Sequence, residues 1–515
     1  MTDSTAIPPV IPPAAQAAPA AAPGTWFGHP RGLATLFFTE MWERFSYYGM
    51  RALLVLYMTA AAGAGGLGLS QEHSGAVYGL FTAGAYLSAL PGGWVADRVL
   101  GARRSVIWGG LGIALGNFLL VVPHSTVAFY IGLVVIAFGT GFLKPNASCL
   151  VGELYRNDSG SRRDAGFSIY YVGINVGALL APFVIGTVGE TAGYRWGFLL
   201  VGIAMIAGVV QYRFTAHWLG DAGLHPHPAP QAQQRRARWL FAAASVALAL
   251  VVAAAALGLV RLDAVRLASL AGLFMLLLAL FFFGSVLLVR SLTAAEKKRI
   301  AVIAVFFVCS ALFWAGYEQA GTSLNIFARD YTDRSFLGSL FPSGEHPVSW
   351  YQAPQAVFVL SFAPLFAWIW LRLGARGADP SPPAKFGLGL LQLGASFLVM
   401  MLAAQIVLHT GHRVLPWWLI FTYLLQTTGE LFLSPIGLSN VTKLAPARYS
   451  GQMMGTWFLG MALGNLMAGL IGGEVGGSIA ELPHQFLQMA LVAGVSGAVT
   501  LAIARPLKRW IGGVA

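Results

Sequence analysis

Residues 39–51 read Thr-Glu-Met-Trp-Glu-Arg-Phe-Ser-Tyr-Tyr-Gly-Met-Arg and carry four charged side chains within an otherwise apolar segment. A charged side chain at the centre of a bilayer costs about 2.5–3.5 kcal/mol on insertion scales. The charges and two tyrosines recur at helical i, i+3 and i+4 spacings, so they share one stripe of a helix. The stretch therefore predicts a membrane helix whose polar stripe faces a protein interior; its members are Glu40, Glu43, Arg44, Tyr47, Tyr48 and Arg51.

The composition of the whole chain supports this interpretation. Of the 515 residues, 57% are hydrophobic and 10% are charged, and the mean hydropathy is +0.68. Soluble domains contain about 25% charged residues, so the chain is expected to be a polytopic membrane protein in a lipid bilayer. Cys149 and Cys309 show no spacing typical of a metal site or a disulfide framework. No phosphate loop or nucleophile–base set is present, so we expect no enzyme activity, catalytic residue, metal or cofactor.

Fourteen segments are long and apolar enough to span a bilayer. Alternate loops hold 22 basic residues and the others hold six, which predicts that both termini are cytoplasmic and that the number of spans is even. The net charge of +12 then reflects topology, and no nucleic-acid partner is expected. The predicted spans are 32–61, 75–96, 104–123, 126–152, 166–188, 195–216, 239–260, 267–289, 300–328, 349–371, 386–408, 415–441, 450–473 and 485–505.

A short internal repeat divides these spans into two halves. Leu100-Gly-Ala-Arg103 follows the second span and Leu373-Gly-Ala-Arg376 follows the tenth. The two motifs occupy equivalent places if the uncharged spans seven and eight are a lipid-facing hairpin inserted between six-helix halves, which is a recurring transporter plan. We expect a disordered tail at 1–30, six-helix bundles at 31–217 and 295–506, a linker with the hairpin at 218–294, and a C-terminal tail at 507–515.

Three more charged residues, Lys144, Glu318 and Glu430, lie well inside predicted spans. Ionisable residues within a membrane usually face the interior of the bundle and serve a function. With the four on the first helix they comprise three basic and four acidic groups, which suggests that they pair within one central cavity. For Lys144 an alternative is a side chain that extends from the helix end to the bilayer surface.

Several motifs give the chain a family resemblance. Glu40-x-x-Glu43-Arg44-Phe45-x-Tyr47-Tyr48-Gly49 resembles the first signature of the proton-dependent oligopeptide transporters, within the major facilitator superfamily. Four further stretches resemble that family's patterns in the same order: 92–104, 167–182, 313–324 and 429–439. The resemblance covers nearly the whole chain. It implies an all-α integral membrane protein of the major facilitator fold, with 14 transmembrane helices including the insertion, in a bacterial inner membrane.

The resemblance implies a proton-coupled symporter that imports di- and tripeptides by alternating access, and we expect it to function as a monomer. The positions matching Arg44, Arg51 and Lys144 face the peptide carboxylate in the family, and the one matching Glu430 binds its amino terminus. Arginine suits a carboxylate through its bidentate fork. The other implied substrate-binding residues are Tyr48, Asn175, Trp314, Gln355, Ser434 and Trp457. For Asn175 a polar core position is the alternative, and for the aromatic residues ordinary packing.

Proton coupling requires carboxylates whose partners change during transport. We expect Glu43, together with Glu40, to be a proton site that pairs alternately with Lys144 and with the bound substrate. Arg44 is adjacent in sequence and is expected to take part in this proton coupling. Glu318 is expected to pair alternately with Arg51 or Lys144 and so to hold the outer side closed. Asp97 and Arg98 are expected to belong to a cytoplasmic gating network.

The sequence departs from the family pattern at three positions: Phe81 where a tyrosine is common, Ser74 where some members have a proton-handling histidine, and Gln355 where many have asparagine. His73 is adjacent to Ser74 and is a further candidate. A symporter for nitrate or another small anion is the alternative on the same fold, although Glu430 would repel an anion. A channel or a membrane enzyme is the alternative of a different class.

Overall fold

The computed structural model describes residues 25–512 except 124, 157, 159, 227–229, 260–262 and 475–477. Most of the expected tail at 1–30 and the last residues of the tail at 507–515 lie outside this description. Residues 25–30 form a small antiparallel hairpin, β1 (Thr25–Trp26) with β2 (His29–Pro30). The first residues of the expected tail at 507–515 belong to a helix, α18 (Ala504–Ile511). Leu507 and Ile511 are buried, so this helix packs against the rest of the protein.

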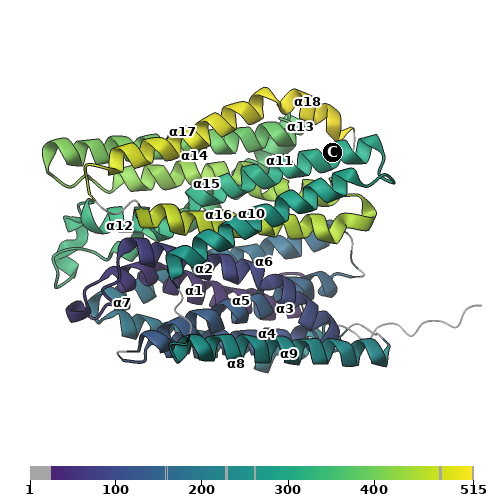
Figure 1. The fold of residues 1–515 in the computed structure, drawn as a ribbon, viewed down its shortest axis with the longest axis horizontal. Helices are drawn as coiled ribbons and strands as arrows, with labels where there is room; N and C mark the ends of the chain where they lie inside the picture. The colour runs from purple at the N-terminus through teal and green to yellow at the C-terminus, as the bar shows by residue number, and fades with distance from the viewer. Residues whose placement is uncertain are drawn as a thin grey trace, which may run out of the picture.

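Long helices run side by side along the molecule, with the N-terminal part of the chain on one side and the C-terminal part on the other (Figure 1). The N-terminal half comprises α1 (Gly32–Thr59), α2 (Gln71–Leu87), α3 (Ala89–Val95), η2 (Ala96–Leu100), α4 (Ala102–Leu120), α5 (Thr126–Leu154), α6 (Gly160–Ala181), η3 (Pro182–Gly186), α7 (Thr187–Thr191) and α8 (Tyr194–Thr215).

The C-terminal half comprises α11 (Ala294–Tyr317), η5 (Glu318–Gly321), α12 (Ser323–Asp330), η7 (Val348–Gln352), α13 (Ala353–Ala375), α14 (Pro382–Thr410), α15 (Trp417–Leu444), α16 (Ser450–Glu474), α17 (Leu482–Ala502) and α18. Short turns complete the chain: η1 (Ala62–Ala64), η4 (Ala216–Leu219), η6 (Ser335–Leu340) and η8 (Ala447–Tyr449). Local sequence sets several helix starts. Ser70 caps α2, Ser125 caps α5, and Thr293 with Glu296 forms a capping box on α11.

Within the described residues, ten helical segments are long and apolar enough to cross a membrane, and they coincide with ten of the fourteen predicted spans. The other four predicted spans coincide with α1, α2 continued by α3, α4 and α15. These four are less apolar or shorter: α1 carries its four charges, and α2 has 17 residues. The total of fourteen spans therefore stays a prediction.

The inserted helices α9 (Gln231–Ala256) and α10 (Ala264–Leu288) lie in different places on the molecule. α9 lies along the outside of the N-terminal half, where it contacts η2 (Figure 1). α10 lies at the boundary between the halves and packs against both α2 and α16. Both helices still expose many large apolar side chains, such as Leu250 and Phe281, as expected of lipid-facing helices.

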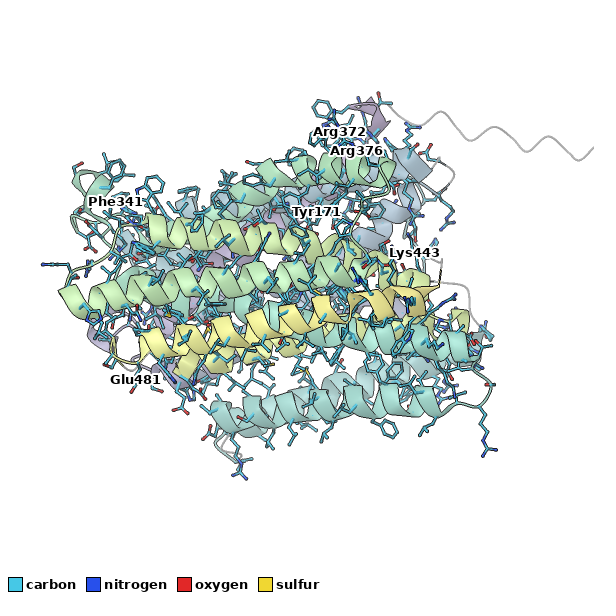
Figure 2. The ribbon with its side chains drawn as sticks, turned by 90° about the horizontal axis from the view of Figure 1, so that it is seen from above. Tyr171, Phe341, Arg372, Arg376, Lys443 and Glu481 are labelled. Carbon is cyan, nitrogen blue, oxygen red and sulfur yellow. The ribbon has the colours of Figure 1, made fainter. Side chains whose placement is uncertain are left out.

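The two ends of the molecule differ in the residues they carry. Arg372, Arg376 and Lys443 lie towards one end, and Phe341 and Glu481 lie at the other (Figure 2). We call the end with Phe341 and Glu481 the outer end and the opposite one the inner end. Side-chain contacts between the halves gather at the outer end. Asn325 Nδ2 donates to Ala52 O at 3.1 Å, and an Arg329 guanidinium nitrogen donates to Thr59 Oγ1 at 2.9 Å.

Candidate functional site

The charged stripe of α1 is buried, as its spacing predicts. Glu40, Glu43, Arg44 and Arg51 each expose 4% or less of their surface. Arg44 lies between the two carboxylates: it donates to Glu43 through two nitrogens, and its Nε is 3.5 Å from Glu40 Oε1. Tyr170 on α6 also donates to Glu40, with 2.6 Å between the oxygens. Every carboxylate of the stripe therefore has a buried partner, which offsets the cost of removing it from water.

Arg51, one helical turn nearer the outer end than Tyr48, reaches the other half of the molecule. A terminal nitrogen of its guanidinium lies 3.0 Å from Glu318 Oε2 on η5, and both side chains are buried. Tyr78 on α2 donates to the same carboxylate oxygen at 3.5 Å. The predicted partner of Glu318 in this state is thus Arg51 rather than Lys144, and the ion pair joins the two halves.

Lys144 on α5 lies with its amino group 4.8 Å from the ring centroid of Tyr86, a cation–π distance. Among the described residues it forms no ion pair, although it is electrostatically close to Glu40 and Glu43. The expected pairing with Glu40 or Glu43 is absent here because Arg44 and Tyr170 hold those carboxylates.

Glu430 on α15 lies in the C-terminal half beside the hydroxyl of Tyr317. The ring centroid of Tyr48 lies 5.9 Å from the Arg44 guanidinium and 5.7 Å from that of Arg51. Glu430 is among the charges that act on both Tyr48 and Tyr171. Tyr171 lies midway along the molecule, yet half of its surface is accessible (Figure 2).

The remaining predicted binding residues fall into two groups. Trp314, Gln355 and Ser434 each have a buried polar side-chain atom with no hydrogen-bond partner among the described residues. A buried polar group without a partner carries a desolvation cost, so such atoms are suited to contact a polar ligand. Asn175, in contrast, donates to Tyr171 O of its own helix at 3.0 Å, and Trp457 packs against Gly437.

Other predicted residues lie away from this cluster. Asp97 and Arg98 are exposed on η2, at one end of the N-terminal half. His73 is near the start of α2 at the outer end, and its Nε2 lies 2.8 Å from the hydroxyl of Tyr130. Ser74 hydrogen-bonds Ser70 O. Phe81 is close to the site, because its ring stacks on Tyr47 with centroids 6.5 Å apart.

A family model described as "POT family" matches residues 103–475, which is more than half of the chain. The chain belongs to the POT family. It is 40% identical over 495 residues to a peptide transporter of Yersinia enterocolitica, which covers 94% of this chain and 96% of that relative. It is 36% identical over 501 residues to a di-/tripeptide transporter of Lactococcus lactis, covering 95% and 98%.

Solved structures of POT transporters have the same fold. A peptide transporter POT crystallised with sulfate superposes with a TM-score of 0.87 at 38% identity, covering 95% of this chain and 97% of that one. Another POT transporter, in complex with 5-aminolevulinic acid, gives 0.83 at 31% identity and covers 94% and 98%. These findings confirm the predicted family, the helical major facilitator fold and the classification as a membrane transporter rather than an enzyme.

Sequence patterns give no role to four tyrosines of this POT chain that lie near predicted charges: Tyr170, Tyr171, Tyr86 and Tyr317. A signal was present for two of them, because Tyr170 and Tyr171 stand in the family-like stretch 167–182. Tyr86 and Tyr317 lie in apolar helices where a tyrosine is not distinctive. Tyr170 gives a hydroxyl to Glu40, Tyr317 gives one to Glu430, and the ring of Tyr86 lies against Lys144. A pattern based on charged residues does not reveal these contacts.

Proposed function

We propose that this chain imports di- and tripeptides together with protons across the bacterial inner membrane, as an alternating-access symporter with both termini in the cytoplasm. The observation that carries the proposal is the set of opposite charges that the two halves place near Tyr48 and Tyr171. Arg44, Arg51 and Lys144 come from the N-terminal half, and Glu430 comes from the other. A zwitterionic peptide requires a cation for its carboxylate and an anion for its ammonium group, and this arrangement offers both.

The side-chain contacts suggest how protons drive the cycle. Glu43 and Glu40 share Arg44, and Glu318 holds Arg51 across the halves. A carboxylate that gains a proton loses most of its attraction for a guanidinium. Protonation of Glu318 would therefore weaken the link between the halves, and a peptide carboxylate entering beside Arg44 would compete with Glu43. The six-helix bundles at 31–217 and 295–506 would move relative to each other, with no cofactor other than the proton.

Reconstitution into proteoliposomes tests this function. We expect unlabelled di-alanine in the lumen to drive uptake of labelled di-alanine, and external di-alanine to acidify the lumen when an electrical gradient is imposed. Nitrate in place of di-alanine serves as the comparator. Counterflow with nitrate but not with di-alanine would indicate the small-anion alternative. A flux of di-alanine without proton movement would overturn the coupling.

A further inference from the structure

Glu190 on α7 makes a second link between the halves, at the outer end and apart from the charged cluster. Its two carboxylate oxygens accept hydrogen bonds from the backbone of η7 in the other half. Val348 N lies 2.8 Å from Oε2, and Ser349 N lies 2.8 Å from Oε1. An ionised carboxylate accepting two N–H groups forms hydrogen bonds roughly twice as strong as those between neutral groups.

Neighbouring contacts reinforce the same link. Trp350 Nε1 donates to Thr187 Oγ1 at 2.8 Å, and Ser349 Oγ lies 3.5 Å from Pro182 O. A Cβ added to Gly186 would lie 1.9 Å from Ser349 Oγ, so glycine is needed for this close approach. We use the term outer clasp for these contacts of Glu190, Thr187 and Pro182 with residues 348–350.

We infer that Glu190 is a positioning residue for transport: it holds η7 against α7 while the outer end is closed, and it must release η7 whenever that end opens. The inference rests on the alternating access of the proposed function. The outer clasp joins α7 to η7, whereas the Arg51–Glu318 pair joins α1 to η5, so the two links act on different helices. Loss of Glu190 should shift the protein towards an outward-open form.

The test is cysteine labelling in intact cells with a membrane-impermeant maleimide. The background chain carries Cys149→Ser and Cys309→Ala, and the probe is Ala353→Cys, because Ala353 follows η7 and is 1% exposed. Glu190→Gln keeps the size of the side chain, but its amide has only one oxygen that can accept a hydrogen bond from Val348 N or Ser349 N. We expect labelling to become about tenfold faster, the ratio that corresponds to about 1.4 kcal/mol.

The matched control is Glu345→Gln. Glu345 is also a carboxylate at the outer end, but it pairs with Arg334 and Arg413 inside the C-terminal half. Its loss should leave labelling unchanged. Equal labelling of Glu190→Gln and the background chain would overturn the inference.

If Glu190→Gln does not reach the membrane, Trp350→Phe removes the Nε1 donor of the clasp and keeps an aromatic ring against Phe183 and Phe341. Faster labelling of that variant supports the inference, and unchanged labelling overturns it. The readout requires no peptide. The two proposals can therefore fail separately. If Glu190→Gln is labelled faster but the protein shows no di-alanine counterflow, the inference about the outer clasp stands and the proposed substrate is rejected.

Discussion

Arg44 illustrates how single residues make buried charge tolerable in this protein. Its guanidinium lies between Glu43 and Glu40 and within 4.9 Å of the Tyr47 ring centroid. Removing one member of such a group leaves an uncompensated buried charge, which is more costly than replacing the group as a whole. Because each charge depends on its partners, Arg44, Glu43 and Glu40 are suited to couple proton and peptide transport. A proton on Glu43 or a peptide carboxylate beside Arg44 changes which ion pairs are favourable.

Glu43→Gln should abolish proton-driven accumulation of di-alanine and spare exchange, since the amide cannot take up a proton but leaves the substrate cations in place. For each co-transported proton, a gradient of one pH unit supports about tenfold accumulation, so the variant should lose at least that ratio. Uptake with and without a pH gradient measures it in proteoliposomes. Retained gradient-driven accumulation would reject the role of Glu43.

His346, in the outer loop before η7, is expected to make stability depend on pH. Burial lowers the pKa of His346, so the folded state binds its proton less readily than the unfolded chain. The unfolded chain then holds more protons, and stability falls as the pH drops through about 6.5 towards the lower folded value. The melting temperature of His346→Gln should decline less from about pH 7.5 to 5.5 than that of the unsubstituted protein. Exposed His412→Gln is the control, and an identical decline in both would contradict the expectation.

At the scale of elements, the interface of α2 with α16 depends on glycine. A Cβ added to Gly469 would lie 2.4 Å from Gly75 O and 2.5 Å from the Cα of Gly79. The two helices therefore approach with backbone against backbone, in the manner of small-residue contacts between membrane helices. This contact joins the two halves, as the Arg51–Glu318 pair and the outer clasp also do.

Gly469→Ala should destabilise the protein by about 1–3 kcal/mol, because the added methyl group forces the helices apart. A lower melting temperature and reduced di-alanine uptake are the expected measurements. Gly284→Ala on α10 is the matched control. Its Cβ would meet nothing within 4 Å, and alanine favours a helix over glycine by about 1 kcal/mol. Equal effects of the two substitutions would contradict the close-approach argument.

At the scale of the whole molecule, the halves meet at the outer end. The buried residues of α13 all lie in its first two turns: Ala353, Gln355, Ala356 and Val359. Trp368 and Leu371, nearer the inner end, are exposed. The side-chain contacts described above between the two halves also lie towards the outer end. The structure is therefore closed at its outer end.

The orientation in the membrane can be tested with two cysteines in the same cysteine-free background. Glu481→Cys should react with an impermeant maleimide added to intact cells, because Glu481 lies at the outer end. Lys443→Cys should react only after permeabilisation, because basic loops remain in the cytoplasm. The reverse pattern would invert the assignment of both termini.

The sequence permits prediction of much of this arrangement, and particular residues show where prediction ends. The stripe on α1 and the importance of Glu318 follow from the cost of burying charge in a membrane helix. The choice of Arg44 over Lys144 as the partner of Glu43 depends on side-chain geometry, which spacing does not determine. The role of Glu190 has no sequence signal, because its partners are backbone N–H groups, which every residue except proline possesses. The position of α10 depends on packing that an apolar composition leaves open.

That position has a mechanical consequence. α10 touches α2 in one half and α16 in the other, so it cannot stay fixed to both when they rotate apart. Its buried side chains are mostly small or flexible: Ala264, Ala268, Met275 and Ala279, followed by Phe283 and Val286. Among the described residues, α10 makes no side-chain hydrogen bond to either neighbour. α10 can therefore slide along α2 or α16 without breaking a side-chain hydrogen bond. The inserted helix would then stay packed between the two halves while they rotate relative to each other.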